Sequence, residues 1–243
     1  MANVVIITGA SSGLGLALAG SVPFPARVVG VSRSGPPEGA NTEHIAADLA
    51  DVASWAGLSR QITEIIGNEN PDRAVFIHAA GTLDPIGFAG EVEFGPYVNN
   101  IVLNSAAGQA LGHAFLSAVR DRHGTYDLVM ISSGAARNDY PGWSAYGAGK
   151  AALDQWVRYV GAEQKLRGGV RVTAIAPGVM DTEMQAAIRS MSEKEFPRVQ
   201  RFRDMYEQGE LIAPEDAARR LWGAVESGLQ SGSVIDLREF GRP

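Results

Sequence analysis

Short apolar runs rich in β-branched residues alternate along the chain with stretches in which apolar residues recur every three or four positions. The first pattern predicts buried strands, and the second predicts helices with one buried face. Strands are expected at residues 3–8, 27–32, 43–46, 74–79, 126–132, 170–176 and 234–237. Helices are expected after the glycine loop that follows the first strand, at about 51–66, 97–120 and 146–167, and from Pro214 onward. Strands that alternate with helices build a doubly wound parallel sheet, so we expect an α/β fold with helices on both faces.

Length and composition favour a single soluble, cytoplasmic domain. At 243 residues the chain is long enough for a large core, and residues 1–243 are expected to form one domain. The chain has no cysteine, which excludes a disulfide framework, and its four histidines show no metal-ligand spacing. Its 27 acidic and 21 basic residues give a net charge of −6 without a basic patch, so we expect neither nucleic acid nor an anionic membrane as a partner. The first apolar run lacks a basic leader, and no segment is long enough to span a membrane.

The glycine-rich segment TGASSGLG follows the first predicted strand and leads into LALAGS, a good helix start. Glycines let a backbone approach a ligand closely, and the unpaired N–H groups of a helix N-terminus attract anions. A strand, a glycine loop and a helix in this order therefore predict a site for the pyrophosphate of a dinucleotide. The alternative is a tight turn in a buried βα unit. The candidate cofactor-binding residues of this loop are Gly9, Ser11, Ser12, Gly13, Leu14 and Gly15.

A further candidate cofactor contact is Arg33, which follows the second predicted strand and stands eighteen positions after Gly15. In dinucleotide folds the end of this strand meets the adenosine ribose. There an acidic residue binds the 2′-hydroxyl of NAD, whereas an arginine accepts the 2′-phosphate of NADP. No acidic residue follows the strand before Glu38. The sequence therefore favours NADPH or NADP+ as the cofactor, the alternative being a solvated arginine with no ligand.

The candidate catalytic residues lie around the fifth predicted strand and the helix after it. That strand delivers Ser133 to the edge of the sheet at which ligands bind in such folds. Tyr146 and Lys150 are four residues apart and share one helix face, unless they are an accidental surface pair. A phenol has an unperturbed pKa of about 10, and a nearby ammonium favours its anion. We therefore expect Tyr146 to have a lowered pKa and to serve as a general acid or base.

Residues 179–212 form an insertion at the same edge of the predicted sheet. The insertion is polar with scattered large apolar residues, namely Met184, Ile188, Met191, Phe196 and Phe202. This pattern is typical of a helical lid over an apolar pocket, although an ordinary pair of surface helices would also fit. Tyr140, Trp143 and Met184 are the predicted lining of a roomy apolar substrate pocket suited to an aromatic or vicinal diketone.

Taken together, TGASSGLG, Ser133, Tyr146-x-x-x-Lys150 and the turn PGVMDT resemble the short-chain dehydrogenase/reductase family over essentially the whole chain. The resemblance implies a Rossmann-type single domain in which Tyr146 is the catalytic acid or base, and Lys150 tunes it and holds the nicotinamide ribose. It also implies that Ser133 polarises the substrate carbonyl, that Asn104 holds a water of the proton relay, and that Thr182 contacts the nicotinamide carboxamide. The further cofactor contacts that it implies are Asp48, Leu49, Ala80, Gly81, Pro177, Gly178 and Val179.

Two features depart from the family pattern. The sequence HAAG at 78–81 stands where the family usually has Asn-Asn-Ala-Gly, which puts in doubt the hydrogen bonds that tie down the cofactor loop. Ser12 stands where some NADPH-dependent members carry a basic residue, which leaves Arg33 as the main candidate for the 2′-phosphate. His78 itself lies inside an apolar run and is predicted to be a core histidine rather than a ligand.

Within the family, residues 131–156 and 176–203 resemble the bacterial benzil reductases that form (S)-benzoin, and the chain is also similar to sepiapterin reductases. The first resemblance implies NADPH-dependent reduction of a small carbonyl compound such as benzil. The second implies a pterin carbonyl, with Asp236 as its anchor. Because family members mostly form dimers or tetramers, we expect a homodimer or homotetramer that assembles through the helices near Tyr97 and Tyr146.

Two functions of other classes fit parts of the sequence. Residues 142–144, Gly-Trp-Ser, begin the nucleophile elbow of a serine hydrolase, but the motif G-x-S-x-G requires glycine where Tyr146 stands. A regulator that binds NADPH without turnover could use the same fold, because fold alone does not fix function. The complete set of catalytic candidates favours an enzyme, since a sensor has no need of a proton donor.

Overall fold

Seven parallel strands form one sheet in the order β3-β2-β1-β4-β5-β6-β7 in the computed structural model, which describes residues 2–240. The strands are β1 (Asn3–Thr8), β2 (Arg27–Ser32), β3 (Glu43–Ala46), β4 (Arg73–His78), β5 (Thr125–Ile131), β6 (Arg171–Ala176) and β7 (Val234–Asp236). The strand order reverses between β1 and β4. Ligands of open parallel sheets bind at such a reversal, outside the carboxyl ends of the strands.

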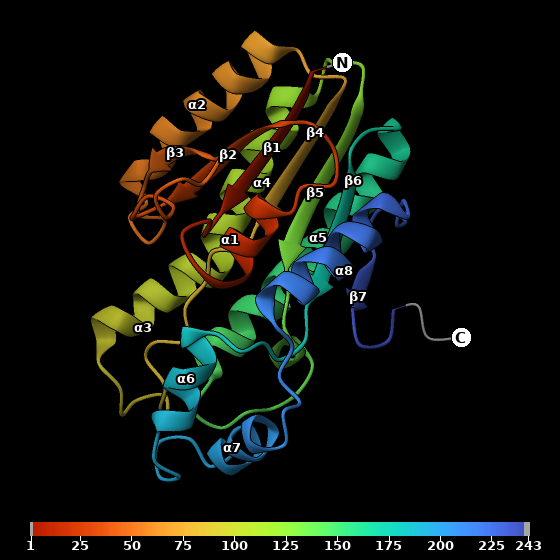
Figure 1. The fold of residues 1–243 in the computed structure, drawn as a ribbon. Coiled ribbons are helices and arrows are strands. Elements are labelled where there is room, and N and C mark those ends of the chain that lie inside the picture. Colours follow the sequence, from red (N-terminus) through yellow and green to blue (C-terminus); the bar gives the residue numbers. More distant parts are fainter. Residues whose placement is uncertain (1, 241–243) are drawn as a thin grey trace.

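Eight α-helices accompany the sheet in the described part of the chain, and five of them pack on its faces (Figure 1). They are α1 (Gly13–Gly20), α2 (Ala53–Glu69), α3 (Phe94–Ile101), α4 (Ala107–Val119), α5 (Ser144–Arg167), α6 (Glu183–Ser190), α7 (Val199–Glu207) and α8 (Pro214–Glu226) in the described part of the chain. Helices α2, α4 and α5 cover one face of the sheet, and α1 and α8 cover the other. The predicted doubly wound α/β fold is therefore confirmed. Within residues 2–240, no helix combines the length and the apolar character that a membrane crossing requires.

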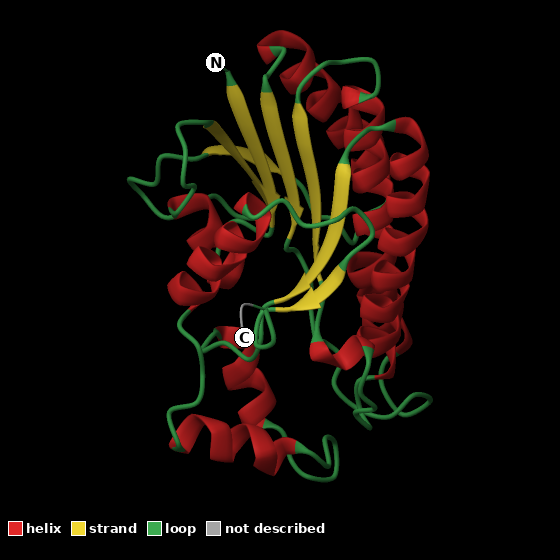
Figure 2. Cartoon of the chain, turned by 90° about the vertical axis from the view of Figure 1, so that its right-hand side faces the viewer, coloured by secondary structure: helices red, strands yellow, loops and turns green. Residues whose placement is uncertain are grey.

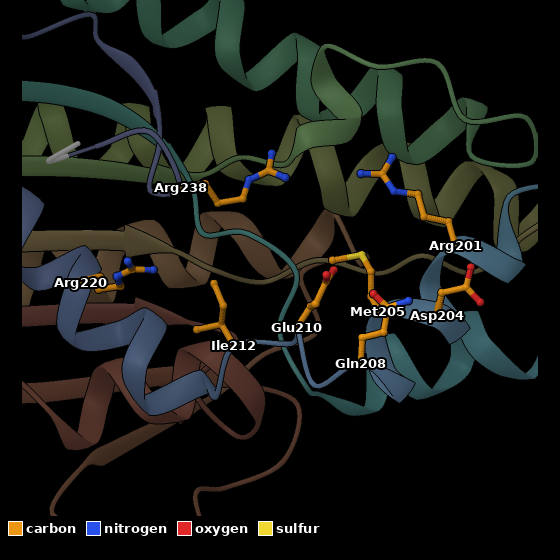
Figure 3. Close-up of a pocket in the computed structure, with 8 residues that line it drawn as sticks. All are labelled: Arg201, Asp204, Met205, Gln208, Glu210, Ile212, Arg220 and Arg238. Atoms are coloured by element: carbon orange, nitrogen blue, oxygen red, sulfur yellow. The ribbon is translucent and has the colours of Figure 1, made fainter. Parts of the chain in front are cut away.

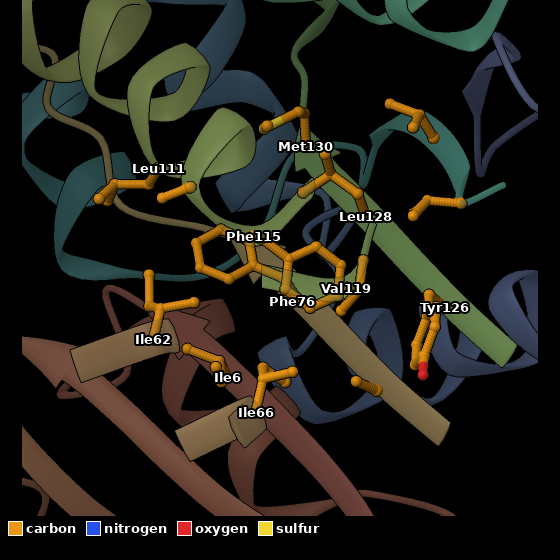
Figure 4. Packing of buried hydrophobic residues seen from close by; sticks show 14 of the residues in the cluster. Ile6, Ile62, Ile66, Phe76, Leu111, Phe115, Val119, Tyr126, Leu128 and Met130 are labelled. Atoms are coloured by element: carbon orange, nitrogen blue, oxygen red, sulfur yellow. The ribbon is translucent and has the colours of Figure 1, made fainter. Parts of the chain in front are cut away.

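The β-branched strands are buried on both faces, as a parallel sheet between two helix layers requires. Along β1, Val4 and Ile6 point into the core under α2, α4 and α5, whereas Val5 and Ile7 point toward α1 and α8. Figure 4 shows the first of these cores, where the rings of Phe76 and Phe115 lie 5.6 Å apart beside isoleucines of β1 and α2. Burying one such side chain contributes roughly 1.5–3 kcal/mol, so the two cores fix the strand register that positions the sheet edge.

The helix predicted at 97–120 begins earlier and is not regular throughout. A π-helical turn at Val102–Ala106 separates α3 from α4, with Asn104 at its centre. A π turn inserts one extra residue into the helical repeat, which apolar periodicity does not register. On α5, Leu153 and Val157 are core residues, whereas Leu166 near the end of the helix is 90% exposed.

The insertion between β6 and α8 folds as a helical unit beyond the carboxyl ends of the strands, where α6 and α7 lie apart from the two helix layers (Figures 1 and 2). Its two ends are joined by a parallel bridge between Met180 and Ile212. In this bridge the Ile212 N–H donates to Val179 O at 3.0 Å, and the Asp181 N–H donates to Ile212 O at 3.0 Å. These backbone hydrogen bonds hold the two ends of the insertion together, and the helices between them extend beyond the carboxyl edge of the sheet.

Candidate active site

One cavity of about 780 Å³ runs along the carboxyl edge of the sheet and collects most of the predicted site residues. Every residue proposed for the cofactor lines it: Gly9, Ser11, Ser12, Gly13, Leu14, Gly15, Arg33, Asp48, Leu49, Ala80, Gly81, Tyr146, Lys150, Pro177, Gly178, Val179 and Thr182. Ser133, Tyr140, Trp143 and Met184 line it as well. Asn104 and Asp236 are buried and lie behind its wall.

The glycine loop between β1 and α1 has the backbone that a phosphate site needs. Gly9 and Gly13 have positive φ angles of 71° and 50°, which favour glycine. A Cβ on Gly15 would lie 2.1 Å from the carbonyl oxygen of Gly9, so no larger residue fits there. Ser12 occupies the N-cap of α1 but makes no side-chain capping bond, so the first N–H groups of the helix stay available to an anion at the cavity wall.

Thr8 and His78 tie the loop after β4 to the end of β1, where the family uses asparagines. The Thr8 hydroxyl accepts a hydrogen bond from Ala80 N–H at 3.2 Å and pairs with His78 Nδ1 at 2.9 Å. His78 is fully buried, as predicted for a core histidine, and its Nε2 has no hydrogen-bond partner among residues 2–240. Burial and the nearby Lys150 charge lower the pKa of His78 to about 3, against a smaller opposing effect of the Leu103 backbone. The departure from the family motif therefore leaves this loop attached through a neutral imidazole.

Helix α5 and strand β5 bring the three catalytic candidates together. Helix α5 begins at Ser144, so Tyr146 lies in its first turn and Lys150 lies one turn further on the same face. The Lys150 ammonium donates to the carbonyl of Ile131 at 2.9 Å, and its nitrogen lies 5.8 Å from the centre of the Tyr146 ring. Ser133 follows β5 and starts a 3₁₀ turn, in which its hydroxyl accepts from Ala135 N–H at 3.1 Å. All three face the cavity.

The electrostatics of Tyr146 differ from the sequence-based expectation. Burial raises the pKa of Tyr146, and hydrogen bonding with Ser133 opposes this only in part. Burial also lowers the pKa of Lys150 to about 8, with the Asp154 carboxylate acting in the opposite direction. The expected lowering of the Tyr146 pKa by the Lys150 charge is wrong for this structure, because desolvation of the phenol dominates. At neutral pH the phenol therefore keeps its proton and can donate it.

Asp154 is a buried carboxylate that sequence reasoning missed. It lies four residues after Lys150 on α5 and is 2% exposed, and neither of its oxygens has a hydrogen-bond partner among the described residues. Burial raises the pKa of Asp154, while the Ser132 hydroxyl and nearby cations oppose the shift. The signal available in the sequence is the i, i+4 spacing from Lys150, which places an acid on the same helix face.

The Asn104 carboxamide braces the loop after β4. Its Nδ2 donates to Thr82 O at 2.7 Å and to Asn100 Oδ1 at 2.8 Å, and its Oδ1 accepts from Thr82 N–H at 3.1 Å. A Cβ on Gly81 would lie 2.8 Å from that Oδ1. The side chain is thus used within the protein, and its predicted part in a water relay stays a prediction.

Asp236 does not reach the cavity as a free carboxylate, contrary to the expectation of a pterin anchor. Its side chain is 2% exposed, and Arg238 binds it with two hydrogen bonds, Nε to Oδ1 at 2.9 Å and Nη2 to Oδ2 at 2.6 Å. Arg137 adds an ion pair at 3.6 Å. These cations lower the pKa of Asp236. The charged group that lines the cavity here is the guanidinium of Arg238, which sequence reasoning missed.

Aromatic side chains join the insertion to the catalytic helix. Trp143, three residues before Tyr146, stacks on Phe196 of the insertion with ring centres 4.6 Å apart and lies 5.4 Å from Phe202. Tyr140 packs against Trp143 at 4.9 Å, and Trp143 meets the Tyr146 ring edge-on at 5.7 Å. Tyr140 and Trp143, two of the predicted pocket residues, therefore form one aromatic cluster with the insertion. The arrangement does not support the serine hydrolase alternative. Ser144 is the first residue of α5, and its hydroxyl pairs with the Tyr97 hydroxyl at 3.1 Å.

Comparisons with known proteins match this arrangement. The family described as short chain dehydrogenase matches residues 3–193. A benzil reductase of Bacillus subtilis (strain 168) that forms (S)-benzoin is 35% identical over 243 aligned residues, which cover 98% of this chain and 99% of that protein. Sepiapterin reductase of Mus musculus is 31% identical over 254 residues and 96% of each chain.

Solved structures also match over the whole fold. A protein from Beutenbergia cavernae, described as an NAD(P)-dependent gluconate 5-dehydrogenase with NADP bound at low occupancy, has a TM-score of 0.78 at 26% identity. The match covers 97% of this chain and 94% of the other. The likeness therefore includes the insertion that carries α6 and α7 as well as the glycine loop.

Proposed function

The chain belongs to the short-chain dehydrogenase family and is an oxidoreductase, and we propose that it is an NADPH-dependent carbonyl reductase. Its proposed substrates are ketones of the aromatic or vicinal diketone class, such as benzil, which would give (S)-benzoin. The observation that carries the proposal is the buried Tyr146 phenol. Its raised pKa keeps it protonated, and it faces the same cavity as Ser133 and Lys150.

The residues along the cavity fit a nicotinamide dinucleotide. The cradle at Gly15 excludes any side chain, and the uncapped N-terminus of α1 offers backbone N–H groups to the pyrophosphate. Arg33, at the end of β2, would hold the 2′-phosphate of NADPH, and Lys150 and Thr182 would hold the nicotinamide half. The bound cofactor supplies the hydride for the reaction.

The chain itself supplies the proton and the stabilisation of the developing charge. As hydride reaches the carbonyl carbon, negative charge grows on the carbonyl oxygen. The Ser133 hydroxyl would hydrogen-bond that oxygen while the Tyr146 phenol protonates it. The Lys150 ammonium then lowers the free energy of the phenolate that remains, because a positive charge stabilises a nearby anion. General acid catalysis of this kind contributes typically 10²–10⁴-fold.

Tyr140, Trp143 and Phe202 line the cavity, with Phe196 packed against Trp143, and they support an apolar, roomy substrate site. Residues 179–212 would act as its lid. Benzil and related diaryl diketones suit such a site. Similarity to sepiapterin reductase makes a pterin carbonyl the second candidate, but the engaged carboxylate of Asp236 disfavours it. The homodimeric or homotetrameric assembly and the cytoplasmic location stay predictions from the sequence.

Turnover of benzil and of sepiapterin, each followed by NADPH oxidation, tests the proposal. NADH serves as the cofactor control, and chiral analysis of any benzoin identifies the product. We expect NADPH to be consumed with benzil and (S)-benzoin to accumulate. Preference for sepiapterin would assign the enzyme to pterin chemistry. Faster turnover with NADH would refute the cofactor assignment, and binding of NADPH without reduction of any ketone would refute the reductase.

A further inference from the structure

A second hollow of about 670 Å³ adjoins the active-site cavity. Arg201, Met205 and Arg238 line both hollows and therefore form the wall that separates them. Figure 3 shows the guanidinium groups of Arg201 and Arg238 extending toward one another from opposite sides of the second hollow. Two cations thus converge at the end of the cavity that also holds the catalytic groups.

Arg238 is held in place by Asp236, and its guanidinium retains N–H donors that this pair does not use. Its Nε and Nη2 are fixed by the buried Asp236, and its stem lies 3.6 Å from the position of a Cβ on Gly178. An arginine has five N–H donors, so a side-on pair with one carboxylate through Nε and Nη2 leaves three of them free. The Nη2 atom also lies 3.6 Å from the position of a Cβ on Gly134, the residue after Ser133. The guanidinium of Arg238 therefore lies beside the residue that follows Ser133.

Arg201 supplies the second cation from α7. Its Nη1 donates to the Tyr140 hydroxyl at 3.2 Å, and it makes no ion pair with any residue in 2–240. Two acids line the second hollow, Asp204 and Glu210. Asp204 already accepts a hydrogen bond from Gln200 at 2.7 Å. Neither acid lines the active-site cavity, so the three residues common to both hollows include two cations and no acid.

We propose that Arg238 and Arg201 form a carboxylate-binding subsite, and that the natural substrate is a ketone with a carboxylate within a few bonds of the carbonyl. The proposal deepens the function given above, since it requires the ketone oxygen to lie at Ser133 and Tyr146. An aryl 2-oxo acid fits both walls, with its ring on the aromatic side and its carboxylate on the two guanidiniums. Each turnover would consume one NADPH and one proton and yield the 2-hydroxy acid and NADP+. Benzil would then be accepted because its second carbonyl oxygen occupies the carboxylate position.

The test compares benzoylformate with its neutral methyl ester, which differs from it chiefly in charge. In the unaltered enzyme we expect kcat/KM to be higher for the acid. We expect the ratio of acid to ester to fall about tenfold in Arg201→Met, as loss of a partly exposed charged hydrogen bond implies. Arg238→Met alone would leave the buried Asp236 carboxylate without its main partner, so this substitution is made together with Asp236→Asn. In the double variant we expect the same fall in the ratio of acid to ester. Arg219→Met, which removes an exposed arginine of α8 outside both hollows, is the matched control and should leave the ratio unchanged.

Calorimetric binding of benzoylformate and of its ester to the same four proteins keeps the test independent of turnover. Binding of the acid that is tighter than binding of the ester, and that weakens in the two subsite variants, supports the subsite. This result would hold even if no hydride transfer were observed. Equal binding of acid and ester in the unaltered enzyme, or equal loss of both in the variants, overturns it. Reduction of benzil and the ester but not of the acid would also overturn the subsite while the reductase stands. Binding of the acid without reduction of any ketone would overturn the reductase alone.

Discussion

His78 should make the stability of the fold depend on pH in a way that one substitution removes. It is fully buried, its Nδ1 is paired with Thr8, and its pKa in the native state is lowered to about 3. In the unfolded chain a histidine titrates near 6.5. As the pH falls below about 6.5, the imidazole is protonated in the unfolded chain but stays neutral in the native protein. The free energy of unfolding therefore decreases between about pH 6.5 and pH 3.

The size of the effect follows from the two pKa values. The full difference of about 3.5 pKa units corresponds to about 5 kcal/mol, and the part lost between pH 7 and pH 5 is about 2 kcal/mol. His78→Asn keeps a polar side chain beside Thr8 but cannot take up a proton. The variant should have a lower free energy of unfolding at pH 7, because the smaller side chain leaves space in a packed core. Between pH 7 and pH 5, its free energy of unfolding should fall by about 2 kcal/mol less than that of the unaltered protein.

Urea unfolding at pH 7 and pH 5, at one protein concentration, measures the change in the free energy of unfolding of the unaltered protein and of His78→Asn. Carboxylates titrate alike in both proteins, so the difference between the two changes isolates His78. His113→Asn, which removes an exposed histidine of α4, is the control and should keep the pH dependence of the unaltered protein. Equal losses of stability in the unaltered protein and in His78→Asn would refute the assignment of a buried, neutral imidazole.

Three further predictions concern the cofactor cradle and the catalytic ammonium. Arg33→Ala should raise KM for NADPH by about 10- to 100-fold, as expected for a charged phosphate contact, and change KM for NADH little; an equal rise in both would contradict the contact. Gly15→Ala should abolish NADPH binding in a fluorescence titration, because its Cβ would lie 2.1 Å from Gly9 O, and full-strength binding would show that the loop is not the cradle. Asp154→Asn should lower the pKa of Lys150 below about 8, so the alkaline limb of kcat/KM should move to lower pH, and an unmoved limb would mean that Asp154 does not act on the ammonium.

The strands and the cofactor edge could be predicted from the sequence because their signals are local. The β-branched run at 3–8 matches β1, and Pro214 with its acidic neighbours starts α8 where expected. The glycine loop and Tyr146-x-x-x-Lys150 each carry their spacing within one segment, so the residues that gather along the cavity were largely foreseeable.

The remaining features depend on contacts between distant segments. The approach of Arg238 to Gly134, and the ion pair of Arg137 with Asp236, arise only when the end of the chain packs beside β6 at the sheet edge. The direction of the Tyr146 pKa shift depends on how deeply the phenol is buried, which spacing alone does not reveal. The π turn at Asn104 adds a residue without altering the apolar pattern enough to register.

The central claim is that Tyr146 protonates the product of hydride transfer from NADPH. The most direct measurement is the rate of NADPH oxidation by benzil in the unaltered enzyme and in Tyr146→Phe, with NADPH affinity measured for both by fluorescence titration. The account predicts that the rate falls by about 10²- to 10⁴-fold in the variant while NADPH still binds. Turnover by Tyr146→Phe at the rate of the unaltered enzyme would contradict it.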